Sequence, residues 1–153
     1  DEASKAATAA GDPQRIGLSK LHLAMTDAKE GRQGADKVLV KLAAEADTWG
    51  FKAESVSASV ALGESMVAAK QYAQAQGVLE TAFATSERIG LRVQAAQSHY
   101  WLSQAFASTG NTTGARQQLQ DAQRELDKIK ADAKDHTATL LKRADLAPIA
   151  AAK

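Results

Sequence analysis

The residue types that most often perform chemistry are few and scattered in this chain of 153 residues. The three histidines are His22, His99 and His136, and none has a second histidine or a glutamate at the spacing of a metal site. The chain contains no cysteine, which excludes disulfides, thiolate metal sites and a cysteine nucleophile. We therefore expect neither a bound metal nor another cofactor.

The remaining polar residues form no catalytic motif. Serine and aspartate are plentiful, but there is no Gly-x-Ser-x-Gly elbow, no glycine-rich phosphate loop and no inward-facing pair of acids. The triplet Asn111-Thr112-Thr113 matches the glycosylation sequon, yet it lies at a predicted tight turn, where its simpler role is turn geometry and helix capping. The sequence indicates a protein that is not an enzyme.

Composition argues against several classes of partner. With 19 basic and 18 acidic residues the formal net charge is +1, which gives no reason to expect nucleic acid or an anionic membrane. No run approaches the roughly 18 apolar residues that span a bilayer, and no signal peptide is recognisable, so we expect no membrane insertion. A cytoplasmic location is favoured, while a periplasmic or secreted one stays open. Because the first residue is Asp1, we expect a processed form or a piece of a longer protein.

A repeat of 40 residues, without a gap, extends through most of the chain. A period of roughly 20–50 residues is typical of repeat architectures, in which each unit buries its apolar face against a neighbour. Segments 31–51, 71–91 and 111–131 align so that apolar residues share four columns: Ala35, Ala75 and Ala115; Leu39, Leu79 and Leu119; Leu42, Ala82 and Ala122; and Trp49, Ile89 and Ile129. On this basis we interpret Trp49 as a core residue.

Within each repeat the apolar spacing predicts two helices and no strand. Asp12 and Pro13 are a good helix start, because aspartate caps free N–H groups and proline suits the first helical position. Gly50 and Gly90 are expected to end second helices. The predicted divisions are a tail or the end of a preceding helix at 1–12, three repeats within 13–136 (13–50, 53–90 and 92–134), and a final segment at 137–153. That segment either caps the apolar side of the last repeat or links to a further domain.

The placing of small and large residues resembles the tetratricopeptide repeat. Repeat two carries the matching series Leu62, Gly63, Met66, Tyr72, Ala75, Leu79 and Ala82. Repeat three carries Leu102, Ser103, Phe106, Gly110, Ala115, Leu119 and Ala122. Repeat one carries Leu21, Met25, Ala35, Leu39 and Leu42, with His22 where a small residue is usual. The family period is shorter, at about 34 residues, and this long-helix variety looks like repeat regions of bacterial signalling proteins.

The resemblance implies an all-α superhelix (a solenoid) of three antiparallel helix pairs, whose first helices line a concave groove. It implies that a peptide or partner protein is bound there by Ser19, Leu23, Thr26, Val60, Glu64, Val67, Gln97, Tyr100 and Gln104. Some family members hold a C-terminal carboxylate on this face with cations and amides. Ser19, Leu23 and Glu64 stand at those positions here, so we reject that ligand. Tyr100 is equally a candidate anchor and a packing residue, and we interpret Trp101 as a packing residue.

The expected function is therefore non-catalytic protein binding, within a larger signalling or regulatory protein. A structural alternative stays open, in which the domain mediates self-association or spacing and forms a homodimer. A third alternative is a sensor that binds a small molecule between repeats.

Overall fold

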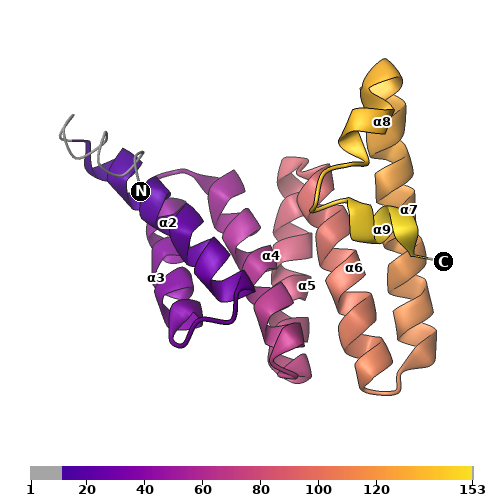
Figure 1. The fold of residues 1–153 in the computed structure, drawn as a ribbon, viewed down its shortest axis with the longest axis horizontal. Helices are drawn as coiled ribbons and strands as arrows, with labels where there is room; N and C mark the ends of the chain where they lie inside the picture. Colours follow the sequence, from indigo (N-terminus) through magenta and orange to yellow (C-terminus); the bar gives the residue numbers. More distant parts are fainter. Residues whose placement is uncertain (1–11, 153) are drawn as a thin grey trace.

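All regular secondary structure in the described part of the chain is helical, as predicted. The computed structural model describes residues 12–152, apart from the side chain of Asp135. The predicted tail at 1–12 lies outside these residues except for Asp12. Six main helices pack in chain order, each against the next (Figure 1): α2 (Pro13–Lys29), α3 (Ala35–Thr48), α4 (Lys52–Ala68), α5 (Tyr72–Ile89), α6 (Arg92–Ser108) and α7 (Thr112–Ala133). Three short helical elements follow: η1 (Lys134–His136), α8 (Thr137–Leu140) and α9 (Ala147–Ala151).

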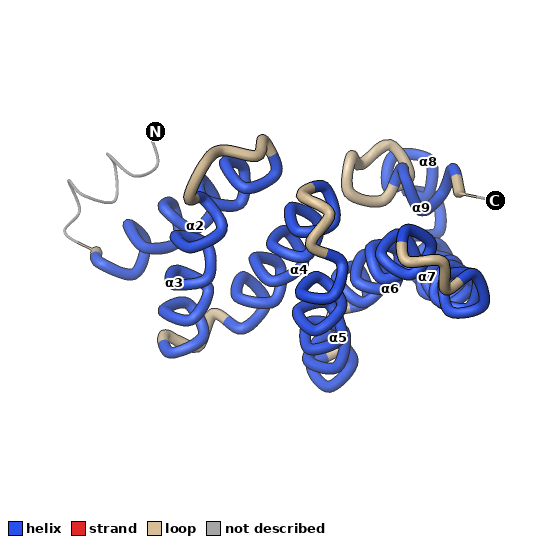
Figure 2. Tube along the Cα trace, turned by 90° about the horizontal axis from the view of Figure 1, so that it is seen from below, coloured by secondary structure: helices blue, strands red, loops and turns tan. Residues whose placement is uncertain are grey.

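The first helices of the three pairs (α2, α4 and α6) pack differently from the second helices (α3, α5 and α7). The first helix α4 contacts both α2 and α6, so the first helices form a continuous layer. Within the described residues, the second helices α3 and α5 make no such contact with each other, and neither do α5 and α7. Figure 2 shows α2 and α9 toward one side of the molecule and α5 toward the other. A surface that crosses all three pairs is therefore built from first helices.

Helix boundaries follow local capping chemistry. The Asp12 carboxylate accepts hydrogen bonds from the backbone N–H groups of Gln14 and Arg15, at 3.0 and 3.2 Å, as the Asp-Pro start predicts. Beyond α3 and α5 the chain turns at Gly50 (φ 87°) and Gly90 (φ 77°), a left-handed conformation that costs glycine little. The N–H of the residue after each glycine bonds back to a carbonyl in the last helical turn, at 2.9 and 2.8 Å.

Helices approach closely where a small residue faces a large one. A Cβ on Gly63 would lie 2.4 Å from Leu79 Cδ2, and a Cβ on Gly17 would lie 2.2 Å from the Trp49 ring. His22, which the repeat alignment places at a small-residue position, is exposed instead. The buried stripe of α2 consists of Gly17, Leu21, Ala24 and Ala28. Burial is confined to this stripe because the described neighbours of α2 are α3 and α4 alone.

The fourth repeat column is not buried throughout. Ile129 is only 8% exposed, whereas Ile89 is 36% exposed and Trp49 is half-buried. The exposed fractions differ because a different length of chain follows each residue and covers it. The helix α7 continues to Ala133, and Leu146 from the C-terminal segment belongs to the same apolar cluster as Ile129, whereas α5 ends at Ile89. The interpretation of Trp49 as a core residue therefore holds only in part.

Gly63→Ala is expected to destabilise the fold, with Gly77→Ala as its matched control. Both glycines lie inside helices, so alanine gains up to about 1 kcal/mol of helix propensity at each. No atom lies within 4 Å of a Cβ on Gly77, whereas at Gly63 the methyl group overlaps the fully buried Leu79. Overpacking of this kind costs about 1–3 kcal/mol. Urea unfolding should place Gly63→Ala below Gly77→Ala by about that amount, and equal stabilities would contradict the close approach of α4 and α5.

Candidate protein-binding groove

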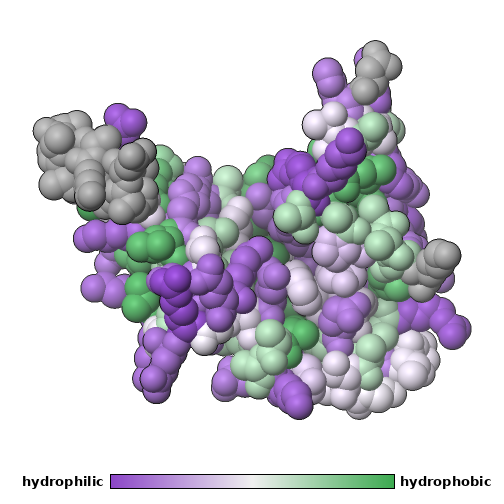
Figure 3. Space-filling view, viewed as in Figure 1, coloured by the Kyte–Doolittle hydropathy of each residue, from purple (hydrophilic) through white to green (hydrophobic). Residues whose placement is uncertain are grey.

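A cavity of about 400 Å³ lies on the face formed by the first helices. Its lining comes from α2 (Met25 and Lys29), α4 (Ser57, Val60, Ala61 and Glu64) and α6 (Val93, Gln94, Gln97, Tyr100 and Trp101). The chain after α8 closes one end, with Arg143, Ala144, Asp145 and Pro148. Figure 3 views this face, on which hydrophilic residues predominate over α4. The size falls within the roughly 300–1,000 Å³ typical of ligand sites.

The structure brings four of the nine predicted groove residues together: Val60, Glu64, Gln97 and Tyr100 line the cavity. Leu23 is 49% exposed and lines a separate cleft between α2 and α3. The other four do not line the cavity: Val67 packs against the Leu79 cluster, Gln104 donates to Ser103 Oγ, Thr26 donates to the carbonyl of His22, and Ser19 is half-buried.

The register of α2 explains the position of Leu23. The first residues of α2 and α4 are Pro13 and Lys52, so equivalent positions in the two helices are 39 residues apart in the sequence. The sequence prediction instead treats Ser19 and Val60 as equivalent positions, which are 41 residues apart. Two residues turn a helix by about 200°, so Met25 rather than Leu23 faces the cavity. The Asp-Pro helix start was the signal in the sequence that could have set this register.

Two ion pairs set the charge of the cavity. Lys29 Nζ lies 2.9 Å from Glu64 Oε2 and so joins α2 to α4. Arg143 holds Asp145 through two bonds, Nη2 to Oδ2 at 2.6 Å and Nε to Oδ1 at 3.0 Å. Burial raises the pKa of Asp145, but the hydrogen bond and charge of Arg143, together with the charge of Lys29, lower that pKa below its ordinary value on balance. The cavity therefore presents matched charges of both signs.

Amides and aromatic rings complete the lining. Gln94 Nε2 donates to Ser57 Oγ at 3.0 Å, and Gln97 Nε2 donates to the carbonyl oxygen of Asp145 at 3.3 Å. Tyr100 and Trp101 meet edge to face, with ring centroids 5.1 Å apart. Both rings also pack in apolar clusters, Tyr100 beside α7 and Trp101 between α4, α5 and α6. Each ring therefore has one part in the core and one part on the cavity wall.

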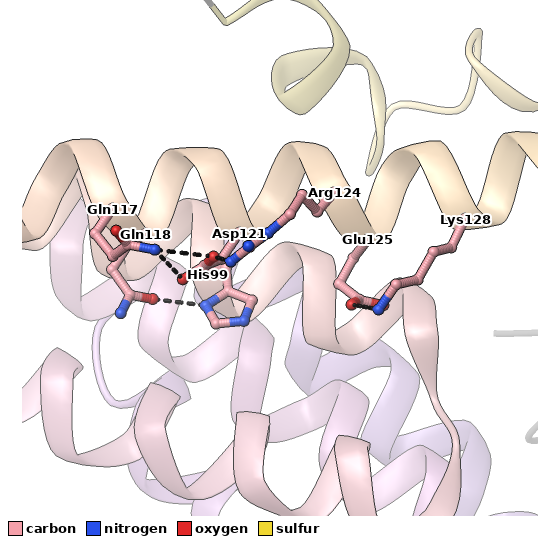
Figure 4. A network of polar contacts seen from close by, with 7 residues as sticks. All are labelled: His99, Gln117, Gln118, Asp121, Arg124, Glu125 and Lys128. Carbon is pink, nitrogen blue, oxygen red and sulfur yellow. Dashed lines mark hydrogen bonds and ion pairs between the residues drawn. The ribbon is translucent and has the colours of Figure 1, made fainter.

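A second polar cluster lies between α6 and α7 (Figure 4) and lines a cleft of about 480 Å³ that also receives Phe83 of α5. His99 is 7% exposed, its Nδ1 lies 2.6 Å from Gln118 Oε1, and its ring centroid is 4.2 Å from that of Phe83. Along α7, Asp121 pairs with Arg124 and Glu125 pairs with Lys128. The cleft exists because α5 and α7 stay apart.

The polar side chains of this second cluster are partnered within the protein. Across residues 12–152, leaving aside the side chain of Asp135, no group of three histidine, aspartate or glutamate side chains could hold a metal ion. The acids of α7 pair with bases one turn away, so their charges are satisfied within one helix. The hydrogen bond of His99 then ties α6 to Gln118 of α7.

Comparison with known proteins identifies no family, since no family model, no curated protein and no solved structure matches the chain. The class that the fold defines is an all-helical domain of sequentially packed helices. None of the helices described in it is long and apolar enough to cross a membrane.

The lowered pKa of Asp145 predicts a contribution to stability that depends on pH. The ionised carboxylate stabilises the folded state above the ordinary pKa of aspartate, about 3.9, and this contribution is lost as the pH falls through the lowered pKa. Asp145→Asn should lower the melting temperature at pH 6 but leave it close to that of the wild type near pH 2. Asp127→Asn, at an exposed carboxylate on α7, controls for the loss of one charge. An equal effect of Asp145→Asn at both pH values would contradict this assignment.

Proposed function

We propose that this chain is a scaffold of the tetratricopeptide type, which binds a peptide or partner protein in the groove on its first-helix face. The observation that carries the proposal is that one cavity receives side chains from the first helix of every pair. The packing supports it, because first helices in contact and second helices apart are expected of a superhelix with a concave first-helix side. The domain would serve within a larger signalling or regulatory protein.

The lining suits a peptide. Gln94 and Gln97 carry amides that can both donate to and accept from peptide groups. Val60 and Val93 provide apolar contact, and Tyr100 provides a rigid aromatic surface at low entropic cost. Lys29 and Glu64 can break their ion pair, and each can then pair with an opposite charge on a partner.

Tyr100→Ala is expected to weaken peptide binding about ten-fold or more, since aromatic anchors contribute a large share of interface energy. Peptides selected from a random library on the full chain would provide the ligands, and calorimetry would give their affinities. Tyr72→Ala is the matched control, because Tyr72 begins α5 and does not line the cavity. Unchanged binding by a folded Tyr100→Ala variant, or an equal loss in Tyr72→Ala, would rule out the groove.

Self-association is a second candidate function, favoured by apolar residues on the outer face of α2 and α3. Leu23 is 49% and Val38 is 52% exposed, and they line a cleft of about 750 Å³ together with Ile16, Leu42 and Trp49. Figure 3 shows hydrophobic residues gathered over this part of the molecule. An exposed apolar face at one end of a helical stack can pair with the same face of a second copy.

Val38→Asp should therefore lower the mass measured by light scattering across a concentration series. Val40→Asp is a close control, because Val40 lies on the same helix at the same 52% exposure but borders the cleft between α3 and α5. A wild-type chain that stays monomeric at all concentrations would exclude self-association through this face.

A further inference from the structure

The chain after α7 returns toward the groove instead of leaving the stack. At the end of α7, Lys134 adopts a left-handed φ of 47°, which is unfavourable for a residue with a side chain and ends the helix. Beyond it, α9 contacts both α6 and α7, and Figure 1 shows α9 crossing in front of them. We refer to residues 141–152 as the strap.

Two apolar side chains anchor the strap. Leu146 is 0% and Ile149 is 1% exposed, which makes them as deeply buried as the core leucines of the repeats. They share a cluster with Ala96 of α6 and with Ala122 and Leu126 of α7. Leu146 and Ile149 are three residues apart, so one short helical turn places both side chains on the same surface.

Polar contacts extend the strap into the groove. Gln97 of α6 donates to the carbonyl oxygen of Asp145, and Gln123 of α7 donates to that of Ala152 at 2.9 Å. The ion pair of Arg143 with Asp145 lines the cavity, as does the pair of Lys29 with Glu64. The strap therefore closes the same cavity that the first helices line.

The strap depends on these contacts for its shape. Its helix α9 has five residues, well below the roughly 12–15 at which an isolated helix becomes marginally stable in water. The preceding residues, 141–146, form turns. Two apolar anchors and a few hydrogen bonds therefore hold a segment that has little regular structure of its own.

We propose that the strap is an internal ligand of the α6–α7 end of the groove, and that it competes with a partner peptide of its own chemistry. Such a peptide carries an acidic residue followed by apolar residues at the next and fourth positions, as in Asp145-Leu146-x-x-Ile149. The identity of the partner rests on the proposed groove function, whereas occupation of the site by the strap does not. A tether of this length gives the strap an effective concentration of about millimolar, so a partner in trans binds only after displacing it.

Release of the strap within the full chain tests this proposal. Leu146→Asp removes the main anchor, and Ala150→Asp introduces the same charge at an exposed position on the same short helix. The probe is a fluorescent peptide with the sequence of residues 141–152, measured by anisotropy. We expect Leu146→Asp to bind the probe about ten-fold or more tightly than do the wild type and Ala150→Asp. A probe peptide that itself carries Leu146→Asp should not bind.

Equal binding of the probe by Leu146→Asp and Ala150→Asp, with α6 and α7 still protected from hydrogen exchange, would overturn the proposal. If Leu146→Asp disturbs the fold, Ile149→Ala provides a milder release. It should give an intermediate gain in probe affinity, and no gain would overturn the proposal.

The two proposals can fail separately. Library-selected peptides that bind wild type and Leu146→Asp equally well would overturn the competing role of the strap and leave the groove function standing. Binding of the strap peptide by Leu146→Asp, without any library peptide that depends on Tyr100, would support the internal ligand and remove the groove function.

Discussion

The distance between successive helices determines most of what this domain can do. Small side chains at the crossings set that distance, as where Gly63 lies against Leu79 and where Ala58, Ala96 and Ala122 have no exposed surface. Backbones that approach closely let the neighbouring large residues fill the adjacent grooves. Because α4 packs against both α2 and α6, the three first helices share one surface, and the cavity lies on that surface.

The sequence predicts the helices well because their signals are local. The Asp12 cap, the left-handed glycines and the apolar spacing each act within a few residues. Depth of burial is less predictable, since Ile89 and Ile129 occupy the same repeat column but differ in what covers them. In α4 and α6, where the repeat spacing is regular, the prediction holds for Val60, Glu64, Gln97 and Tyr100 but not for Val67 and Gln104, which lie nearer the helix ends. The groove residues of α2 are not predicted correctly, because an alignment error of two residues assigns them to the opposite side of the helix.

The repeat pattern does not predict which residues of the groove, α6 and α7 the strap contacts. Residues 143–148 match no column, and the sequence predicts only that segment 137–153 either caps the apolar side of the last repeat or links to a further domain. Their apolar residues suggest only that some surface is covered. The structure supplies the missing information, because Gln97 and Gln123 meet strap carbonyl groups and Leu146 enters the α6–α7 cluster. A polar groove with internally paired charges thus adjoins a segment held mainly by apolar contact.

The separation of the second helices has a mechanical consequence. When a stack of this kind bends, the layer in direct contact acts as the hinge and keeps its spacing, while the opposite side opens and closes. Here α2, α4 and α6 form the contacting layer, and the clefts beside α5 lie on the open side. Elastic deformation would therefore alter the clefts around Val78 and His99 more than the groove. A load applied along the stack would first change the spacing of helices at positions distant from the cavity on the first-helix face.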